Sequence, residues 1–206
     1  MVRINFYGIA YPVTALGPGN RVVLWVCGCQ KRCPGCISPE MQKSKSGKKI
    51  EIMKLMKYLT KLNHSLEGIT ISGGEPFDQP QALKELLAAV AIEKPSWNNI
   101  IYSGYTLSEI LSDKKKKAPV LEFVDILING CYQQDIPSNH PLTGSGNQVI
   151  HYLTSRGLAL KERIDSLPMD QANLGLGNSH HHLLIGILKP VVRKEIHKTL
   201  QIPEMR

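Results

Sequence analysis

Four of the five cysteines lie close together, at positions 27, 29, 33 and 36. Cys29, Cys33 and Cys36 form a C-x3-C-x2-C pattern within one expected loop, and thiolates spaced this closely can bind iron or zinc. Three thiolates on a four-iron cluster would leave one iron free for a substrate or cofactor. Because the cysteine count is odd and we see no export signal, a disulfide framework is a poor fit. The pattern predicts a metal or redox centre.

A structural zinc site is the alternative, because Cys27 would complete a set of four thiolates. If the alternation of the preceding strand continues, Cys27 and Cys29 point to the same side, so the spacing leaves both interpretations open. Metal analysis would separate them. Cys131 is expected to be a half-buried thiol, and the histidines at 180–182 are expected on a surface loop.

A second motif, Ser72-Gly-Gly-Glu-Pro76, follows one expected strand and precedes an expected helix. Its two glycines would let a ligand approach the backbone. Glu75 could receive an ammonium group in a charge-assisted contact. Taken alone, a Gly-Gly pair after a strand is more often just a tight turn.

Strands and helices alternate along the first two thirds of the chain. Apolar periodicity and turn residues predict strands over 21–26, 68–72, 99–102 and 123–128, and helices from Glu51, from about Pro80 to Glu93, and after a capping box at Thr106 to Glu109. Beyond Asn147 the pattern weakens: 148–153 and 183–188 could be strands, and 156–174 is unclear. We find no internal repeat and no second domain.

This alternation implies right-handed crossovers and a parallel sheet. Loops at the carboxyl ends of parallel strands share one edge of a sheet. The cysteine loop, the Gly-Gly-Glu-Pro loop and the turn at 102–104 should therefore converge on one site.

Length and hydropathy bound the class of protein. A chain of 206 residues and 22.9 kDa suits one domain. The longest apolar stretches, 22–27 and 86–92, fall far below the roughly 18 residues of a membrane span, and the N-terminus lacks the apolar region of a secretion signal. We expect a cytoplasmic protein that does not enter a membrane.

The net charge is 25 − 17 = +8, carried partly by lysines between 43 and 49 and by Lys114 to Lys117. Such a surface could meet an acidic protein or nucleic acid. Short lysine runs without interleaved aromatic residues are more often solvated loops, so nucleic acid binding is the minor hypothesis.

Together these segments resemble the radical S-adenosylmethionine superfamily, and more closely the small activating enzymes of anaerobic ribonucleotide reductase and their near relatives. The resemblance rests on Gly17-Pro-Gly-x-Arg21, on 22–26 running into Gly28 and the three cysteines, and on 72–77, 103–107, 124–128 and 144–148. It implies an α/β fold, a partial (β/α) barrel with a mostly parallel sheet. It also implies a single domain over 1–206, with a core at about 12–153 and a C-terminal extension, 154–206, of uncertain structure.

The resemblance also implies the cofactors. Cys29, Cys33 and Cys36 would bind a [4Fe-4S] cluster, and S-adenosylmethionine would chelate the fourth iron. The expected contacts to S-adenosylmethionine are Gly73, Gly74 and Glu75 at its methionyl end, Ser103 at the position that usually contacts the ribose, and Asn147 in a segment shared by the close relatives.

The implied activity is reductive cleavage of S-adenosylmethionine to a 5′-deoxyadenosyl radical, which takes hydrogen from a glycine of a partner glycyl-radical enzyme. An electron donor such as flavodoxin would reduce the cluster. A short chain with an incomplete barrel and no obvious insertion is expected to leave the site open to a macromolecule.

Two alternatives remain. Leu16, Thr143 and the region of Asn129 depart from the usual family pattern, which favours a standalone enzyme acting on a peptide or small metabolite. A zinc-binding basic nucleic-acid module is the third hypothesis, and it predicts a colourless protein with salt-dependent binding.

Overall fold

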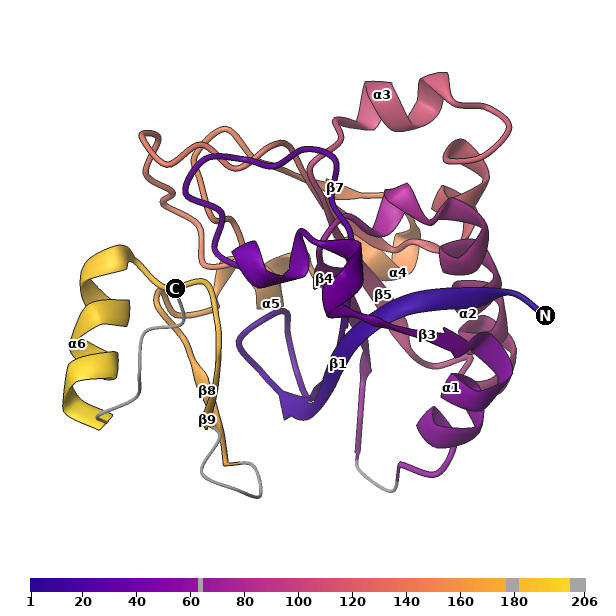
Figure 1. Ribbon diagram of the computed structural model, residues 1–206, viewed down its shortest axis with the longest axis horizontal. Helices are drawn as coiled ribbons and strands as arrows, with labels where there is room; N and C mark the ends of the chain where they lie inside the picture. The colour runs from indigo at the N-terminus through magenta and orange to yellow at the C-terminus, as the bar shows by residue number, and fades with distance from the viewer. Residues whose placement is uncertain (63–64, 177–181, 201–206) are drawn as a thin grey trace.

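The chain is described by a computed structural model over residues 1–62, 65–176 and 182–200. Seven strands form one sheet in the order β3-β1-β2-β4-β5-β6-β7 (Figure 1). The strands are β1 (Arg3–Val13), β2 (Arg21–Val26), β3 (Lys48–Glu51), β4 (Gly68–Gly73), β5 (Asn98–Ser103), β6 (Ile126–Asn129) and β7 (Val149–Tyr152). A separate hairpin consists of β8 (Asn173–Leu176) and β9 (His182–Ile185).

The four central strands, β2, β4, β5 and β6, pair in parallel. The pairs β1 with β2, β1 with β3, and β6 with β7 are antiparallel, so five of the seven strands run in one direction. This confirms the α/β class and the predominance of parallel strands. Within the described residues the sheet is open, with β3 and β7 at its edges.

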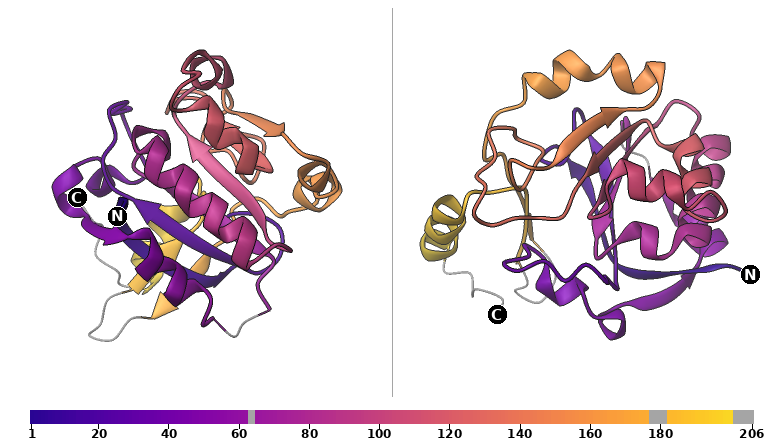
Figure 2. Two further views of the ribbon diagram at one scale, coloured as in Figure 1. Left: turned by 90° about the vertical axis from the view of Figure 1, so that its right-hand side faces the viewer. Right: turned by 90° about the horizontal axis from the view of Figure 1, so that it is seen from above.

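Three helices cover one face of this sheet, which we call the helical face (Figures 1 and 2). They are α1 (Ile52–Leu59), α2 (Pro80–Glu93) and α3 (Leu107–Ser112). Their buried side chains pack against alternate residues of the central strands, Val22, Leu24 and Val26 among them. All six residues of β2 are buried, as expected of a parallel strand covered on both faces.

Most of the expected elements are present, with shifted ends. Helix α2 and the capping box of Thr106 and Glu109 agree with the prediction. Helix α1 ends at Leu59 although apolar residues continue to Leu62. The strand expected from Phe123 begins only at Ile126, because 118–123 form a 3-10 helix with a proline in its first turn. Strands β1 and β3 were not predicted.

The opposite face, which we call the inner face, is not left bare. We call the described residues 155–176 and 182–200 the C-terminal segment; they include α4 (Ser155–Leu158), α5 (Lys161–Asp165), β8, β9 and α6 (Pro190–Leu200). Ile164 and Ile185 from this segment are buried against inner-face residues of the sheet. In Figure 1 the hairpin and α6 lie on the side away from α1 and α2. The C-terminal segment therefore covers part of the inner face, and a site open to a macromolecule stays a prediction.

The Gly-Pro-Gly-x-Arg motif fastens the amino ends of the central strands. Gly17 and Gly19 have φ angles of +141° and +72°, which favour glycine. Arg21 is fully buried and donates to the side-chain oxygens of Thr70 and Asn98, both at 2.7 Å, and to three backbone carbonyls. Burial lowers the pKa of Arg21 to about 9. This motif has a structural role at the end of the sheet opposite the cysteine loop.

No helix within the described ranges is both long enough and apolar enough to cross a membrane.

Candidate functional site

The cysteine loop begins where β2 ends. Gly28 has a φ angle of +96°, and its N–H donates to the carbonyl of Met41 at 2.9 Å. Cys29, Cys33 and Cys36 follow on the loop, and each is a free, half-buried thiol. The loop is thus held at its base while the three thiols stay partly accessible.

Cys27 lies in a different environment from the three loop cysteines. Its side chain is only 1% exposed and packs in an apolar cluster with Trp25 and Met41. Burial also raises the pKa of the Cys27 thiol. Gly28 ends the regular alternation of the strand between Cys27 and Cys29. Cys27 is therefore placed as a core residue beneath the loop.

The thiols do not form a site for a single ion. Across residues 1–62, 65–176 and 182–200, no three His, Cys, Asp or Glu side chains are grouped so that they could hold one metal ion. A structural zinc would need four ligands around one centre. An iron–sulfur cluster, in contrast, presents separate irons to separate thiolates. Metal analysis is the measurement that separates the two kinds of site.

The Gly-Gly-Glu turn is built directly against the cysteine loop. The N–H of Gly74 donates to the carbonyl of Val26 at 2.7 Å, and the N–H of Glu75 donates to the carbonyl of Gly28 at 2.8 Å. A Cβ atom on Gly74 would lie 2.4 Å from the Gly28 oxygen, and one on Gly73 would lie 2.5 Å from the Val26 oxygen. Only glycine permits this approach, so the turn is more than a generic reversal of the chain.

Glu75 is buried, with 1% of its surface exposed. One carboxylate oxygen accepts from the N–H of Phe77 and the hydroxyl of Ser103, both at 2.9 Å, and the other accepts from the N–H of Gly104 at 2.6 Å. Burial raises the pKa of Glu75 to about 7, although these donors act in the opposite direction. The carboxylate therefore joins the carboxyl ends of β4 and β5.

The Ser103 hydroxyl, like the Glu75 carboxylate, is already hydrogen-bonded within the protein. Its hydroxyl donates to Glu75 and accepts from the N–H of Tyr105 at 3.0 Å, and the residue is buried. In this structure the Ser103 side chain positions Glu75. A contact from Ser103 to a cofactor stays a prediction.

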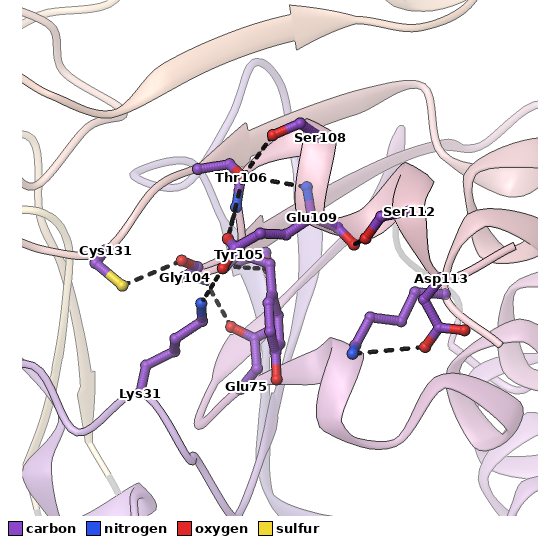
Figure 3. Close-up of polar contacts among 12 residues, drawn as sticks. Lys31, Glu75, Gly104, Tyr105, Thr106, Ser108, Glu109, Ser112, Asp113 and Cys131 are labelled. Carbon is purple, nitrogen blue, oxygen red and sulfur yellow. Dashed lines mark hydrogen bonds and ion pairs between the residues drawn. The ribbon is translucent and has the colours of Figure 1, made fainter.

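A network that the sequence did not suggest surrounds these residues, and Figure 3 shows its part around Lys31, Tyr105 and Glu109. Asp78 accepts from the backbone N–H of Gln30 at 2.9 Å and from the Tyr105 hydroxyl at 2.7 Å. Lys31 lies over the Tyr105 ring, 4.0 Å from its centroid, and pairs with Glu109 at 3.0 Å. The cysteine loop is thus fastened to the loops after β4 and β5. The only sequence signal was the place of Asp78, three residues beyond Glu75.

Asn147 and Cys131 close the site from the loop after β6. The Cys131 thiol, half-buried as expected, donates to the carbonyl of Gly104 at 3.2 Å. The Asn147 side-chain nitrogen donates to the carbonyl of Cys131 at 2.8 Å, while its Oδ1 is buried without a partner among the described residues. An acceptor left free in this position suits a ligand hydroxyl or amine.

The predicted convergence of distant loops is therefore confirmed. Segments around Cys29, Glu75, Ser103 and Cys131 meet at one edge of the sheet through the hydrogen bonds described above. The histidines at 180 and 181 lie outside the described residues, and His182 begins β9. Lys114 to Lys116 are exposed, whereas Lys117 lies over the Tyr105 ring at 4.4 Å.

Comparison with known proteins identifies the class. Residues 15–151 match the model of a 4Fe-4S single cluster domain. An anaerobic ribonucleoside-triphosphate reductase-activating protein of Salmonella typhimurium is 32% identical over 151 residues, 69% of this chain and 96% of that protein. The protein of that name from enterobacteria phage T4 is 29% identical over 146 residues, 69% of this chain and 90% of its own.

A shorter likeness links the chain to a pyruvate formate-lyase-activating enzyme of Clostridium pasteurianum. The two are 36% identical over 75 residues, 34% of this chain and 32% of that enzyme. The chain belongs to the 4Fe-4S single cluster domain family. Within it, the chain is a member of the group that contains the anaerobic ribonucleoside-triphosphate reductase-activating proteins.

Proposed function

We propose that this chain is a radical S-adenosylmethionine activase that installs a radical on a glycine of a partner glycyl-radical enzyme. The observation that carries the proposal is the joining of the cysteine loop to the Gly-Gly-Glu turn, with the N–H of Glu75 bonded to the carbonyl of Gly28 at 2.8 Å. The names of the relatives, which are activating proteins, support the same activity.

The residues present fit the cofactors. Three accessible thiols on one loop, with a fourth cysteine withdrawn into the core, are the donor set of a [4Fe-4S] cluster with one iron left free. Cys29, Cys33 and Cys36 would hold this cluster. The turn of Gly73 and Gly74 offers backbone close to the cysteine loop. When bound, the cluster and S-adenosylmethionine supply the 5′-deoxyadenosyl radical that takes hydrogen from the substrate.

The protein's own groups would bind the cofactors and orient them. Glu75 and Ser103 hold the Gly-Gly turn against the end of β5. The unpaired Oδ1 of Asn147 offers an acceptor to the cofactor. No side chain needs to act as an acid or base, so orientation and exclusion of stray hydrogen donors are the protein's contribution.

The finer features of the fold belong to the same proposal. The open, mostly parallel sheet with helices on one face would be the partial (β/α) barrel of a radical S-adenosylmethionine core. Residues 1–206 would be a single domain, with a core at about 12–153. The proposed activity needs an electron donor such as flavodoxin, so the proposal includes a cytoplasmic location.

The test is anaerobic purification and reconstitution. We expect a brown protein with about four irons and sulfides, which forms 5′-deoxyadenosine slowly with dithionite. Adding the glycyl-radical enzyme encoded in the same genome should produce a protein-centred radical visible by electron paramagnetic resonance.

The standalone alternative predicts a different result. Fast, stoichiometric turnover of a small metabolite without a partner protein would show that the chain is a standalone enzyme and not an activase. A colourless protein that contains one zinc would contradict both.

A further inference from the structure

The C-terminal segment packs on the inner face of the sheet at two separate places. Ile164 lies in an apolar cluster with Ile126 and Leu142, and Ile185 lies in another with Trp25. Both isoleucines are less than 5% exposed. Burial of each side chain contributes about 1.5 to 3 kcal/mol. The segment therefore belongs to the folded body.

Polar contacts fix the same segment to the sheet. The Oδ1 of Asn173 accepts from the N–H groups of Thr14 and Ala15, each at 2.9 Å. Arg156 pairs with the buried carboxylate of Asp125 at 3.1 Å. These contacts bridge more than 30 residues in one case and more than 150 in the other, so they give the segment a defined place.

A cavity of about 600 Å³ lies between this segment and the cysteine loop. Its lining comes from three parts of the chain: the cysteine loop with Cys36, the loop after β6 at 132–144, and the C-terminal segment with Ile187 and Val191. The family match ends at residue 151. One wall of the cavity beside the cluster loop is thus supplied by residues outside the matched domain.

The chemistry of this wall points to one kind of occupant. Lys189 and Lys194 line the cavity, and Lys189 is paired with Asp170 at 3.7 Å. Lys194 is exposed and has no ion pair with the described residues, which leaves a positive charge at a cavity of mixed lining, where Ile187 and Val191 lie together with Gln134 and Ser138. The volume holds a few residues of extended chain but not the edge of a folded domain.

We propose that the C-terminal segment is the docking wall for an extended polypeptide segment of the partner protein, which enters between Tyr132 and Val191 and places an acidic side chain near Lys194. This inference rests on the proposed function, because it takes the hydrogen donor to be part of a protein. It adds that recognition of the partner depends on residues outside the matched domain.

The experiment uses the full chain with its cluster reconstituted and the purified glycyl-radical enzyme from the same genome. Val191→Asp and Lys194→Glu change the wall, whereas Ile92→Asp and Lys115→Glu make matched changes on other surfaces. Val191 and Ile92 are both exposed, at 67% and 77%, so neither change should unfold the protein. The partner concentration for half-maximal radical formation should rise at least tenfold for the wall variants and stay unchanged for the controls.

A second measurement does not depend on activity. A photo-crosslinking benzoylphenylalanine at position 191 should attach to the partner, and the same group at position 92 should not. Equal half-maximal concentrations for the wall variants and wild type, or crosslinking at position 92 alone, would overturn the docking wall.

Formation of 5′-deoxyadenosine without the partner tests the proposed function separately. Its absence in wild type would overturn both proposals. If 5′-deoxyadenosine forms but the group at position 191 does not attach to the partner, the docking wall is wrong while the proposed function stands.

Discussion

The hydroxyl of Ser103 donates to the carboxylate of Glu75 at 2.9 Å, across 28 residues of sequence. This bond ties the end of β5 to the turn after β4. Glu75 is therefore engaged from within the protein before any cofactor binds. The sequence suggested that Glu75 receives an ammonium group of the cofactor. Its carboxylate would have to make that contact in addition to the three hydrogen bonds that it already accepts.

The first prediction follows from those three bonds. Glu75→Gln keeps one acceptor oxygen but turns an amide N–H2 toward the N–H of Gly104, which leaves that donor unpaired. We expect the unfolding free energy near pH 4.5, where the buried carboxyl of wild type is protonated, to fall by about 1 to 3 kcal/mol. The affinity for S-adenosylmethionine should fall as well, while the cluster is retained. Thermal melting and cofactor titration measure the two effects, with the exposed Glu122→Gln as control. Weaker affinity at unchanged stability would indicate a direct ammonium contact instead.

The second prediction concerns pH. Because burial raises the pKa of Glu75 to about 7, from 4.5, the folded state holds more protons than the unfolded state between these values. Stability should therefore be greatest below about pH 4.5, fall as pH rises, and level off above about 7. The total loss is about 3 kcal/mol. Chemical denaturation of cluster-free wild type and Glu75→Gln across this range measures it, and parallel curves would contradict it.

The third prediction separates the cysteines. Alanine at Cys29, Cys33 or Cys36 should abolish the cluster, whereas alanine at Cys27 or Cys131 should retain about four irons. Cys27→Ala removes a buried thiol from the core and should cost about 1 to 2 kcal/mol of stability. Iron and sulfide assays with visible spectra decide the matter. Loss of the cluster in the Cys27 variant, with the Cys33 variant unaffected, would reverse the assignment.

The elements that the sequence predicted well are those with local signals. Helix α2 and the capping box of Thr106 need only their own residues, and β2 is an unbroken apolar run. Strand β1 was missed because it alternates imperfectly, is partly exposed, and contains Pro12. Its pairing with β2 and β3 comes from distant residues. A window of sequence does not contain that information.

In the candidate site, too, local sequence signals were predictive and contacts between distant residues were not. Alternation of strands and helices was enough to bring Cys29, Glu75 and Ser103 to one edge. The partners of each group were not predictable, because Asp78 meets Tyr105 only through the register of β4 and β5. The C-terminal segment was unclear because its elements are short, and its place depends on contacts such as Asn173 with Thr14.

The fourth prediction tests the structural role of Arg21. Arg21→Lys keeps the charge but cannot reach the same acceptors with a planar fork of donors. Several buried oxygens, including that of Asn98, would lose a partner, so we expect a loss of about 2 to 4 kcal/mol. The exposed Arg3→Lys is the control. Calorimetry should show the loss of stability. At low temperature, where the variant is folded, formation of 5′-deoxyadenosine per folded molecule should stay at the wild-type level. A loss of activity without a loss of stability would instead assign Arg21 to the functional site.

The last prediction uses two glycines that differ only in their surroundings. At Gly74 a Cβ would lie 2.4 Å from the carbonyl oxygen of Gly28, whereas at Gly8 it would meet nothing within 4 Å. The Gly74→Ala methyl group must therefore push the turn away from the cysteine loop and break the bond from the N–H of Glu75 to Gly28. Gly8→Ala should leave stability unchanged or raise it, since it restricts the unfolded chain. We expect Gly74→Ala to lose at least tenfold in S-adenosylmethionine affinity, because the backbone that receives the cofactor moves relative to the cluster. Calorimetric titration of both reconstituted variants measures this, and equal affinities would mean that the close approach of the two loops has no part in binding.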